Sequence, residues 1–225
     1  MEKNRKIKFF LVIIISILLV YTILINNETI QKIKNNYFNN LPIYYSNSIS
    51  MYDTSTPEKA IGCSDYVFIA HINRILRTEY KYPVEVEIDT NKTEVITTPY
   101  TVYSINVIKN IKGTLDTSKP IEFMQYGGIN DDNKSYTFTN GGSLLTEGNY
   151  YILMVDTWGG EGGTIEISDT NRIINLGKDF SPNARNYSDI ISKYEEAYKN
   201  EIVPEQETNI MSKFDINYIN TNAEN

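Results

Sequence analysis

An apolar run near the N-terminus constrains this chain more than any other feature. Residues Phe9–Ile25 are almost unbroken in apolar character, a basic segment at residues 1–8 precedes them, and polar residues return at Asn26. A helix over this run would span about 26 Å, which is at the short end of what crosses a hydrocarbon core of ~30 Å. No polar face interrupts the run, which argues against a buried helix of a soluble domain.

The run is compatible with a cleaved signal peptide or with an uncleaved signal anchor. Cleavage requires a pair of small residues after a shorter apolar core, and Val20–Asn27 contains no such pair. We therefore predict a transmembrane signal anchor at residues 9–25. Basic residues stay on the cytoplasmic side, so residues 1–8 should lie in the cytoplasm and the C-terminal domain should be extracellular. The chain is then a single-pass protein of the cell membrane.

Charge and rare residues restrict the function. The net charge is −7, and Cys63 and His71 are the only residues of their kinds. An acidic exterior domain argues against binding of nucleic acid or anionic lipid. One cysteine excludes an intrachain disulfide, and an exported domain without disulfides suits the envelope of a Gram-positive bacterium. We expect no cofactor and no metal site.

The remaining chain divides into a stalk, one domain and a tail. Residues 26–52 lack a clean period and are predicted to be a stalk, residues 53–203 a folded domain, and residues 204–225 a loose polar tail. Ser55–Lys59 has the hydroxyl cap and the early proline of a short helix that ends near Ser64. Asn186–Asn200 has helical periodicity, with Tyr187, Ile190, Ile191, Tyr194, Ala197 and Tyr198 on its apolar side.

Between these helices the sequence predicts strands. Tyr100–Ile111 alternates clearly, Asp65–Asn73 is apolar on both faces and therefore central, and residues 78–98 are mixed, with one further candidate at Val84–Ile88. The other predicted strands are Pro120–Tyr126, Tyr150–Val155, Thr164–Ile167 and Arg172–Leu176. The fold class is mainly β: a small antiparallel OB-like β-barrel with a short N-terminal helix and a C-terminal helix.

The order of several short segments resembles a known family. The segments are Ala60–Phe68, Tyr103–Val107, Ile111–Gly113, Ile121–Phe123 and Gly148–Leu153. They resemble the OB-type barrel of netrin-like and tissue-inhibitor-of-metalloproteinase domains, and of membrane-anchored bacterial surface proteins, over residues 57–177. The resemblance supports the fold more than an activity.

The resemblance also implies protease inhibition, although the chain departs from the pattern that performs it. Those inhibitors chelate the protease zinc through a free N-terminal cysteine. This N-terminus carries no cysteine and is predicted to be tied to a membrane, and the family's disulfides are missing. Inhibition would therefore need another mechanism.

A nucleophile–base pair is not expected near the first strand. If Asp65–Asn73 is one strand, Ser64 and His71 lie about 23 Å apart at ~3.3 Å per residue, whereas a nucleophile and its base need ~3 Å. We interpret Cys63 as a buried small apolar residue and His71 as a satisfied sheet residue rather than a ligand.

The best binding candidate is Trp158, in a glycine-rich turn with Glu161. An exposed Trp is a frequent anchor in recognition, although it could instead fold over an open barrel end. Tyr126, Asp131 and Asp132 lie in or beside the loops near residues 127–142 and complete the predicted binding site. Asn130–Asn133 lacks the spacing of a calcium loop and is interpreted as solvated. Other tyrosines could extend an aromatic surface or simply pack the barrel: Tyr80, Tyr82, Tyr100 and Tyr136.

Three functions follow from these observations. The first is a non-enzymatic, membrane-anchored binding module for an envelope protein or polysaccharide. The second is a protease inhibitor that acts without the N-terminal cysteine. The third is an envelope hydrolase that uses carboxylates such as Glu147, Asp156 and Glu161, whose spacing the sequence does not fix.

Overall fold

A computed structural model describes residues 40–46, 52–89, 92–139, 141–159, 162–181, 184–205 and 210–223. The chain divides into two units, residues 1–42 and 43–225, and the description below concerns the second. The predicted anchor lies outside the described residues, and so do residues 26–39 and 47–51 of the predicted stalk. Residues 43–46 of that stalk form a strand instead. Within the described ranges, no helix combines the length and the apolar character that crossing a bilayer requires.

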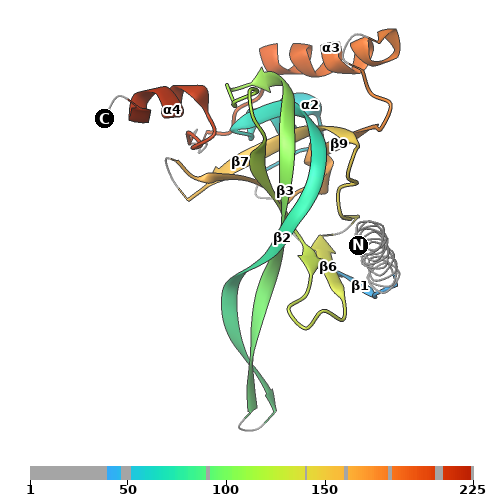
Figure 1. Cartoon of the computed structure of the whole chain (residues 1–225), viewed down its shortest axis with the longest axis vertical. Coiled ribbons are helices and arrows are strands. Elements are labelled where there is room, and N and C mark those ends of the chain that lie inside the picture. Colours follow the sequence, from blue (N-terminus) through green and yellow to red (C-terminus); the bar gives the residue numbers. More distant parts are fainter. Residues whose placement is uncertain are drawn as a thin grey trace, which may run out of the picture. The chain divides into compact units, whose positions relative to one another are not determined.

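One main sheet dominates the second unit, and the prediction of a mainly β fold is confirmed (Figure 1). Its strand order is β2-β3-β4-β8-β7-β9, and β2 also pairs with β7. The pairing therefore runs from β2 through β3, β4, β8 and β7 back to β2. The strands are β2 (Tyr66–Asp89), β3 (Lys92–Lys112), β4 (Ile121–Tyr126), β7 (Tyr150–Trp158), β8 (Thr164–Ile167) and β9 (Ile173–Gly177).

The expectation of purely antiparallel pairing is wrong at one place in this sheet. β8 pairs with β4 in parallel, with Phe123 opposite Ile165. β8 pairs antiparallel with β7 on one side. On its other side it lies beside β4 and runs in the same direction as β4.

The strands bury one continuous set of side chains on their inner face. Alternate residues of each strand point inward, and Phe68, Tyr103, Phe123 and Leu153 are fully buried there. The buried Tyr103 hydroxyl donates to Gln125 Oε1 at 2.8 Å and accepts the Leu145 N–H at 3.1 Å. Its polar group is therefore paired inside the apolar core.

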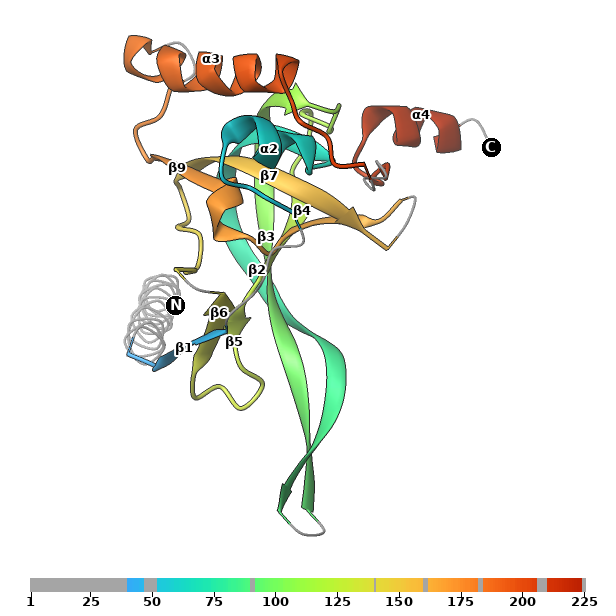
Figure 2. The same cartoon turned by 180° about the vertical axis from the view of Figure 1, so that it is seen from behind.

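Two helices cover the outer face of β2 and β7 (Figure 2). They are α2 (Pro57–Gly62) and α3 (Arg185–Lys199), and both were predicted from the sequence. The Thr56 hydroxyl caps α2 by accepting the Lys59 N–H. Between these helices and the sheet lies a second hydrophobic cluster, which contains Ile69 of β2. Because Phe68 points into the first cluster and Ile69 into the second, β2 is apolar on both faces. Tyr198 was expected on the buried side of α3, but it is 37% exposed.

Beyond the sheet, β2 and β3 continue as a two-stranded ribbon (Figure 1). β2 pairs with β7 only over Tyr66–His71, and β3 pairs with β4 only over Thr101–Ile105. We call residues 74–89 and 92–99 the arm. The prediction that one strand ends at Asn73 and the next begins at Tyr100 is therefore wrong, because β2 and β3 stay paired through the arm. The residues of the arm are largely exposed on both faces, so their sequence shows no burial pattern.

A small second sheet has the order β1-β6-β5. Its strands are β1 (Ile43–Ser46), β5 (Gly128–Ile129) and β6 (Tyr136–Thr139), and β1 runs parallel to β6. The loop between β5 and β6 contains the predicted polar residues Asp131 and Asp132.

The chain after Pro204 was expected to be a loose tail, and this is wrong for residues 210–223. Ile210 N donates to Asp65 Oδ1 at 3.1 Å, Ser212 N donates to the Tyr66 hydroxyl at 2.9 Å, and Ser212 is fully buried. Helix α4 (Ile216–Ala223) follows. Hydropathy does not reveal this docking, because Phe214 alone packs against the main core and the other contacts named here are polar.

Candidate ligand-binding surface

Trp158 is the last residue of β7, and 54% of its surface is exposed. Its indole contacts the Tyr82 ring edge-on, with centroids 6.3 Å apart and an interplanar angle of 88°. Trp158 therefore does not close the end of the sheet, and it is available to a partner. Glu161, the predicted neighbour in the turn, lies outside the described residues.

A bulge in the arm brings Tyr82 to Trp158. The register of β2 against β3 shifts between Lys81 and Val84, and Tyr82 has a left-handed backbone with φ of 53°. A bulge bends its strand and redirects the side chain, and a bulky residue at positive φ persists only where surrounding contacts fix it. The sequence alone marks Tyr82 only as one of several tyrosines.

Two further tyrosines connect Tyr82 to the predicted residue Tyr126. The Tyr82 and Tyr100 ring centroids are 6.2 Å apart, and those of Tyr100 and Tyr126 are 5.5 Å apart, both edge-on. We call Trp158, Tyr82, Tyr100 and Tyr126 the aromatic row. Tyr100 is buried whereas Tyr82 and Trp158 are exposed, so the row has a fixed base and an accessible end. Edge-to-face contacts of this kind stabilise ring positions.

Charged groups lie beside the aromatic row. Lys81 Nζ is 4.9 Å from the Tyr100 ring centroid and 3.3 Å from Met124 Sδ. Glu166 of β8 has a buried Oε2 without a hydrogen-bond partner, and burial raises the pKa of its carboxyl, with Lys81 opposing the shift. Burial, and secondarily the Glu166 charge, raises the pKa of the Tyr82 hydroxyl. The row therefore carries a cation at its face and a poorly solvated carboxyl near its middle.

The other predicted residues come together in a second feature, a groove of about 340 Å³. Tyr126, Asp131 and Asp132 line it, opposite residues 94–99 of β3. Thr97 Oγ1 donates to Asp131 Oδ2 at 3.2 Å and ties the loop to the strand. We call this feature the acidic groove, because its lining includes the carboxylates of Glu94, Asp131 and Asp132 and no Lys or Arg. Tyr126 belongs to both features, so the aromatic row leads into the groove.

Backbone N–H groups within the loop at residues 130–134 hydrogen-bond to acceptors of the same loop. Asp132 Oδ1 accepts the Lys134 N–H at 2.9 Å, and Asn133 turns the chain with φ of 58°. Among the residues that the structure describes, no three His, Cys, Asp or Glu side chains are grouped so that they could hold a metal ion.

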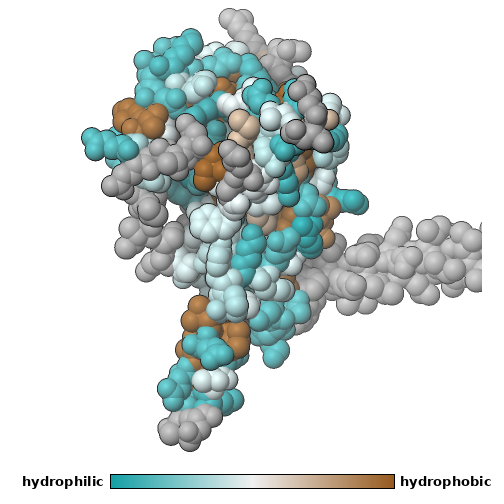
Figure 3. Space-filling view, turned by 90° about the vertical axis from the view of Figure 1, so that its left-hand side faces the viewer, coloured by the Kyte–Doolittle hydropathy of each residue, from teal (hydrophilic) through white to brown (hydrophobic). Residues whose placement is uncertain are grey.

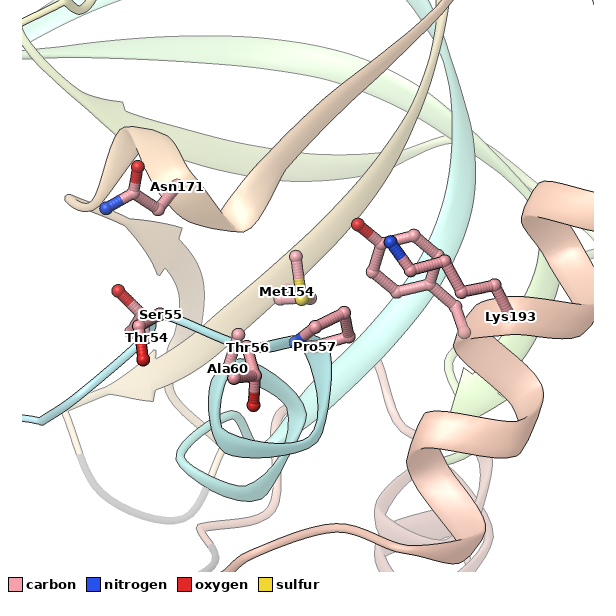
Figure 4. A pocket seen from close by; sticks show the side chains of 9 residues that line it. Thr54, Ser55, Thr56, Pro57, Ala60, Met154, Asn171 and Lys193 are labelled. Atoms are coloured by element: carbon pink, nitrogen blue, oxygen red, sulfur yellow. The ribbon is translucent and has the colours of Figure 1, made fainter.

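A separate pocket of about 320 Å³ lies where α2 meets α3 (Figure 4). Hydroxyl residues leading into α2 lie on one side, Met154 lies behind them, and Lys193 comes from α3. The Thr54 hydroxyl donates to Asp169 at 2.7 Å and the Thr56 hydroxyl caps α2, so these groups are occupied by the fold. None of the residues predicted to bind lines this pocket.

Glu147 and Asp156, two of the carboxylates considered for hydrolysis, do not form a pair. Glu147 lies before β7 and its side chain accepts the Ile75 N–H at 2.7 Å. Asp156 lies near the other end of β7, about 20 Å along the strand from its first residue, Tyr150, at ~3.3 Å per residue. Asp156 is bound by the buried Arg172, which also donates to the Ser64 hydroxyl at 2.7 Å. Arg172 was missed by sequence reasoning, because nothing local marks a buried guanidinium.

Cys63 and His71 occupy structural positions. Cys63 is buried at the end of α2, and its Sγ lies 3.4 Å from the Ala60 carbonyl oxygen. His71 Nδ1 lies 3.0 Å from Asn73 Oδ1, and its ring packs on Tyr150.

Comparison of the chain with protein-family models and with curated proteins finds no match.

Proposed function

We propose that this chain is a membrane-anchored, extracytoplasmic binding module without enzymatic activity. Its sheet is an OB-like barrel, held at the cell membrane by a signal anchor at residues 9–25. Support for the barrel comes from the pairing, which passes through β3, β4, β8 and β7 and returns to β2. A five-stranded Greek-key barrel is the OB-type architecture.

The aromatic row is the observation that carries the binding proposal. OB-type barrels bind ligands on the face of their second and third strands and on the connections that follow the first and fourth strands. In this chain those parts are β3, β4, the arm and the turn after β7. Tyr100, Tyr126 and Tyr82 come from the first three of these parts in that order, and Trp158 is the last residue of β7, next to the turn.

The chemistry of the surface favours an envelope protein or polysaccharide as the ligand. Exposed aromatic rings supply large contact area at little entropic cost, and they dominate binding energy in recognition surfaces. The net charge of −7 opposes binding to nucleic acid. Support for a non-enzymatic role comes from the placement of Ser64 and Glu147, each of which is engaged in a structural hydrogen bond.

Trp158→Ala tests this proposal. In cells that carry the tagged full-length chain, cross-linking and mass spectrometry should capture fewer ligand molecules with the variant, by roughly tenfold if one anchor contributes about 1.4 kcal/mol. The thermal midpoint should not change, because Trp158 is exposed.

Tyr198→Ala is the matched control, since it removes an exposed ring from α3, outside the aromatic row. It should capture as much as the wild type, and a chain that holds only the anchor should capture nothing specific. Equal capture by Trp158→Ala and wild type would remove the aromatic row from the binding site.

A further inference from the structure

The outer edge of β3 is open along the arm. β3 pairs with β2 on one side throughout, but its pairing with β4 covers only Thr101–Ile105. In the described chain, no strand lies along the outer side of residues 94–98. An open edge of this kind offers backbone N–H and C=O groups to another extended chain.

Hydrogen bonds at the end of the open edge show which residues point outward. Gly127 N donates to the Pro99 carbonyl at 2.9 Å, and Thr101 N donates to the Gly127 carbonyl at 3.0 Å. Backbone groups of alternate residues point to the same side of a strand, and β3 shows no bulge on its own side here. Thr97 and Val95 therefore present their N–H and C=O groups to the outer side.

The acidic groove runs along this open edge. Residues 94–99 form one wall and the loop with Asp131 and Asp132 contributes to the other. Val95 and Ile96 are 52% and 51% exposed, and Figure 3 shows apolar side chains gathered on the arm. The groove therefore combines free strand hydrogen-bonding groups, exposed apolar side chains and three carboxylates without a basic residue.

We propose that an extended peptide segment with alternating basic and apolar residues adds to β3 as a further strand at Glu94–Thr98. Thr97 and Val95 supply the backbone hydrogen bonds, and Glu94, Asp131 and Asp132 attract the basic side chains. This inference rests on the proposed binding function and names the partner class as a protein segment.

Charge decides between this partner and a second copy of the chain. Another copy would bring the same carboxylates to the same edge, and like charges that face each other oppose association. The carboxylates also discourage neutral strands from adding, which is a common way to protect an edge. A strand with basic side chains is instead attracted by these carboxylates.

The test uses the full chain in lipid nanodiscs and a synthetic peptide of about eight residues, close to a typical strand length, in which Lys and Val alternate. A peptide with Glu in place of Lys is its control. Of the two peptides, we expect only the Lys–Val peptide to bind the chain, as measured by fluorescence anisotropy. Its affinity should fall as salt is added. We also expect it to slow hydrogen exchange in residues 93–99.

Two variants separate strand addition from simple charge attraction. Thr97→Pro removes the outward N–H and is tolerated on an edge strand, so it should weaken binding by roughly tenfold or more. Thr97→Val loses the same hydroxyl bond to Asp131 but keeps the N–H, so it should bind roughly tenfold more tightly than Thr97→Pro. Near-ultraviolet circular dichroism checks that both variants fold.

Three results would overturn the inference: equal binding of both peptides, binding without slower exchange in residues 93–99, or equal affinity of the peptide for Thr97→Pro and Thr97→Val. Slow exchange of the free chain that is lost on dilution would assign the edge to a second copy and also overturn it. The proposed function is judged separately by Trp158→Ala, so the two can fail independently.

Discussion

At the scale of single residues, Glu166 is the least satisfied group beside the aromatic row. It lies opposite Asp156 in the β7–β8 pairing and near Lys81, and its Oε2 lacks a hydrogen-bond partner. A carboxyl that is buried in this way binds its proton more tightly in the folded chain than in the unfolded chain.

Glu166→Gln should therefore stabilise the chain at neutral pH. Burial raises the pKa of Glu166 above its ordinary 4.5, so the stability of the wild type falls as the pH rises from 4.5 through the folded-state pKa. Gln has no such dependence. Urea unfolding of both chains should show an advantage for the variant at about pH 7 that disappears below about pH 4.5.

Glu122→Gln is the control with the opposite sign. Hydrogen bonds from Arg77 lower the pKa of Glu122 below 4.5, so its contribution to stability is present above pH 4.5 and is lost as the pH falls through the folded-state pKa. The variant should be less stable than wild type at neutral pH. Equal pH profiles for Glu166→Gln and wild type would contradict the assignment.

Single-residue reasoning from sequence found only part of the candidate surface. Trp158 was identifiable because glycines follow it, and Tyr126, Asp131 and Asp132 because they lie in or next to a polar loop. The role of Tyr82 was not identifiable, since its contact with Trp158 depends on a bulge and on a partner far along the chain. No local pattern encodes such a contact.

At the scale of elements, β3 has two halves with different roles. Its C-terminal half lies in the core, where Ile105 is fully buried, whereas Val95 and Ile96 in its N-terminal half are exposed. The core half was predicted because burial of alternate side chains imposes period two on the sequence. The arm half was not, because no such constraint acts on a ribbon with two solvated faces.

Replacement of Val84–Ile96 by an Asn-Gly turn should leave stability nearly unchanged. Residues 84–89 and 92–96 are exposed, so the free energy of unfolding should change by less than about 1 kcal/mol. Ile105→Ala in the same strand should cost about 2–5 kcal/mol. Denaturant titration distinguishes the two, and a loss in the shortened chain as large as that of Ile105→Ala would show that the arm supports the core.

At the scale of the whole molecule, the C-terminal segment joins parts that are distant in sequence. It contacts Asp65 and Tyr66 at the start of β2, and the Thr114 hydroxyl donates to Asp215 Oδ1 at 2.9 Å. Its Met211 carbonyl accepts the Gly162 N–H at 2.9 Å, beside the turn that follows Trp158. The start of β2, the residues just after β3 and the turn after β7 are therefore all hydrogen-bonded to a segment that hydropathy predicted to be loose.

A chain that ends at Glu205 should be less stable than wild type by at least about 2 kcal/mol, because several buried polar groups lose their partners. A chain that ends at Tyr218 is the matched control. It keeps the buried Ser212 and Asp215 and removes residues 219–225, of which residues 219–223 belong to α4, a helix without a buried residue. If both truncations unfold at the same denaturant concentration, residues 210–215 do not hold the sheet together.

The long β2–β3 pairing also has a consequence for the order of folding. Its register starts at Asp89 and Lys92, which are neighbours along the chain, whereas β2 meets β7 through Tyr66 and Val155. Closing a short loop costs less entropy than closing a long one, so we expect the hairpin to form before β7 and β8 complete the sheet. Stopped-flow kinetics should then show slower folding for Ile105→Val and mainly faster unfolding for Ile165→Val. The β2–β3 hairpin would in that case nucleate folding, and the reverse pattern would assign nucleation to β7 and β8.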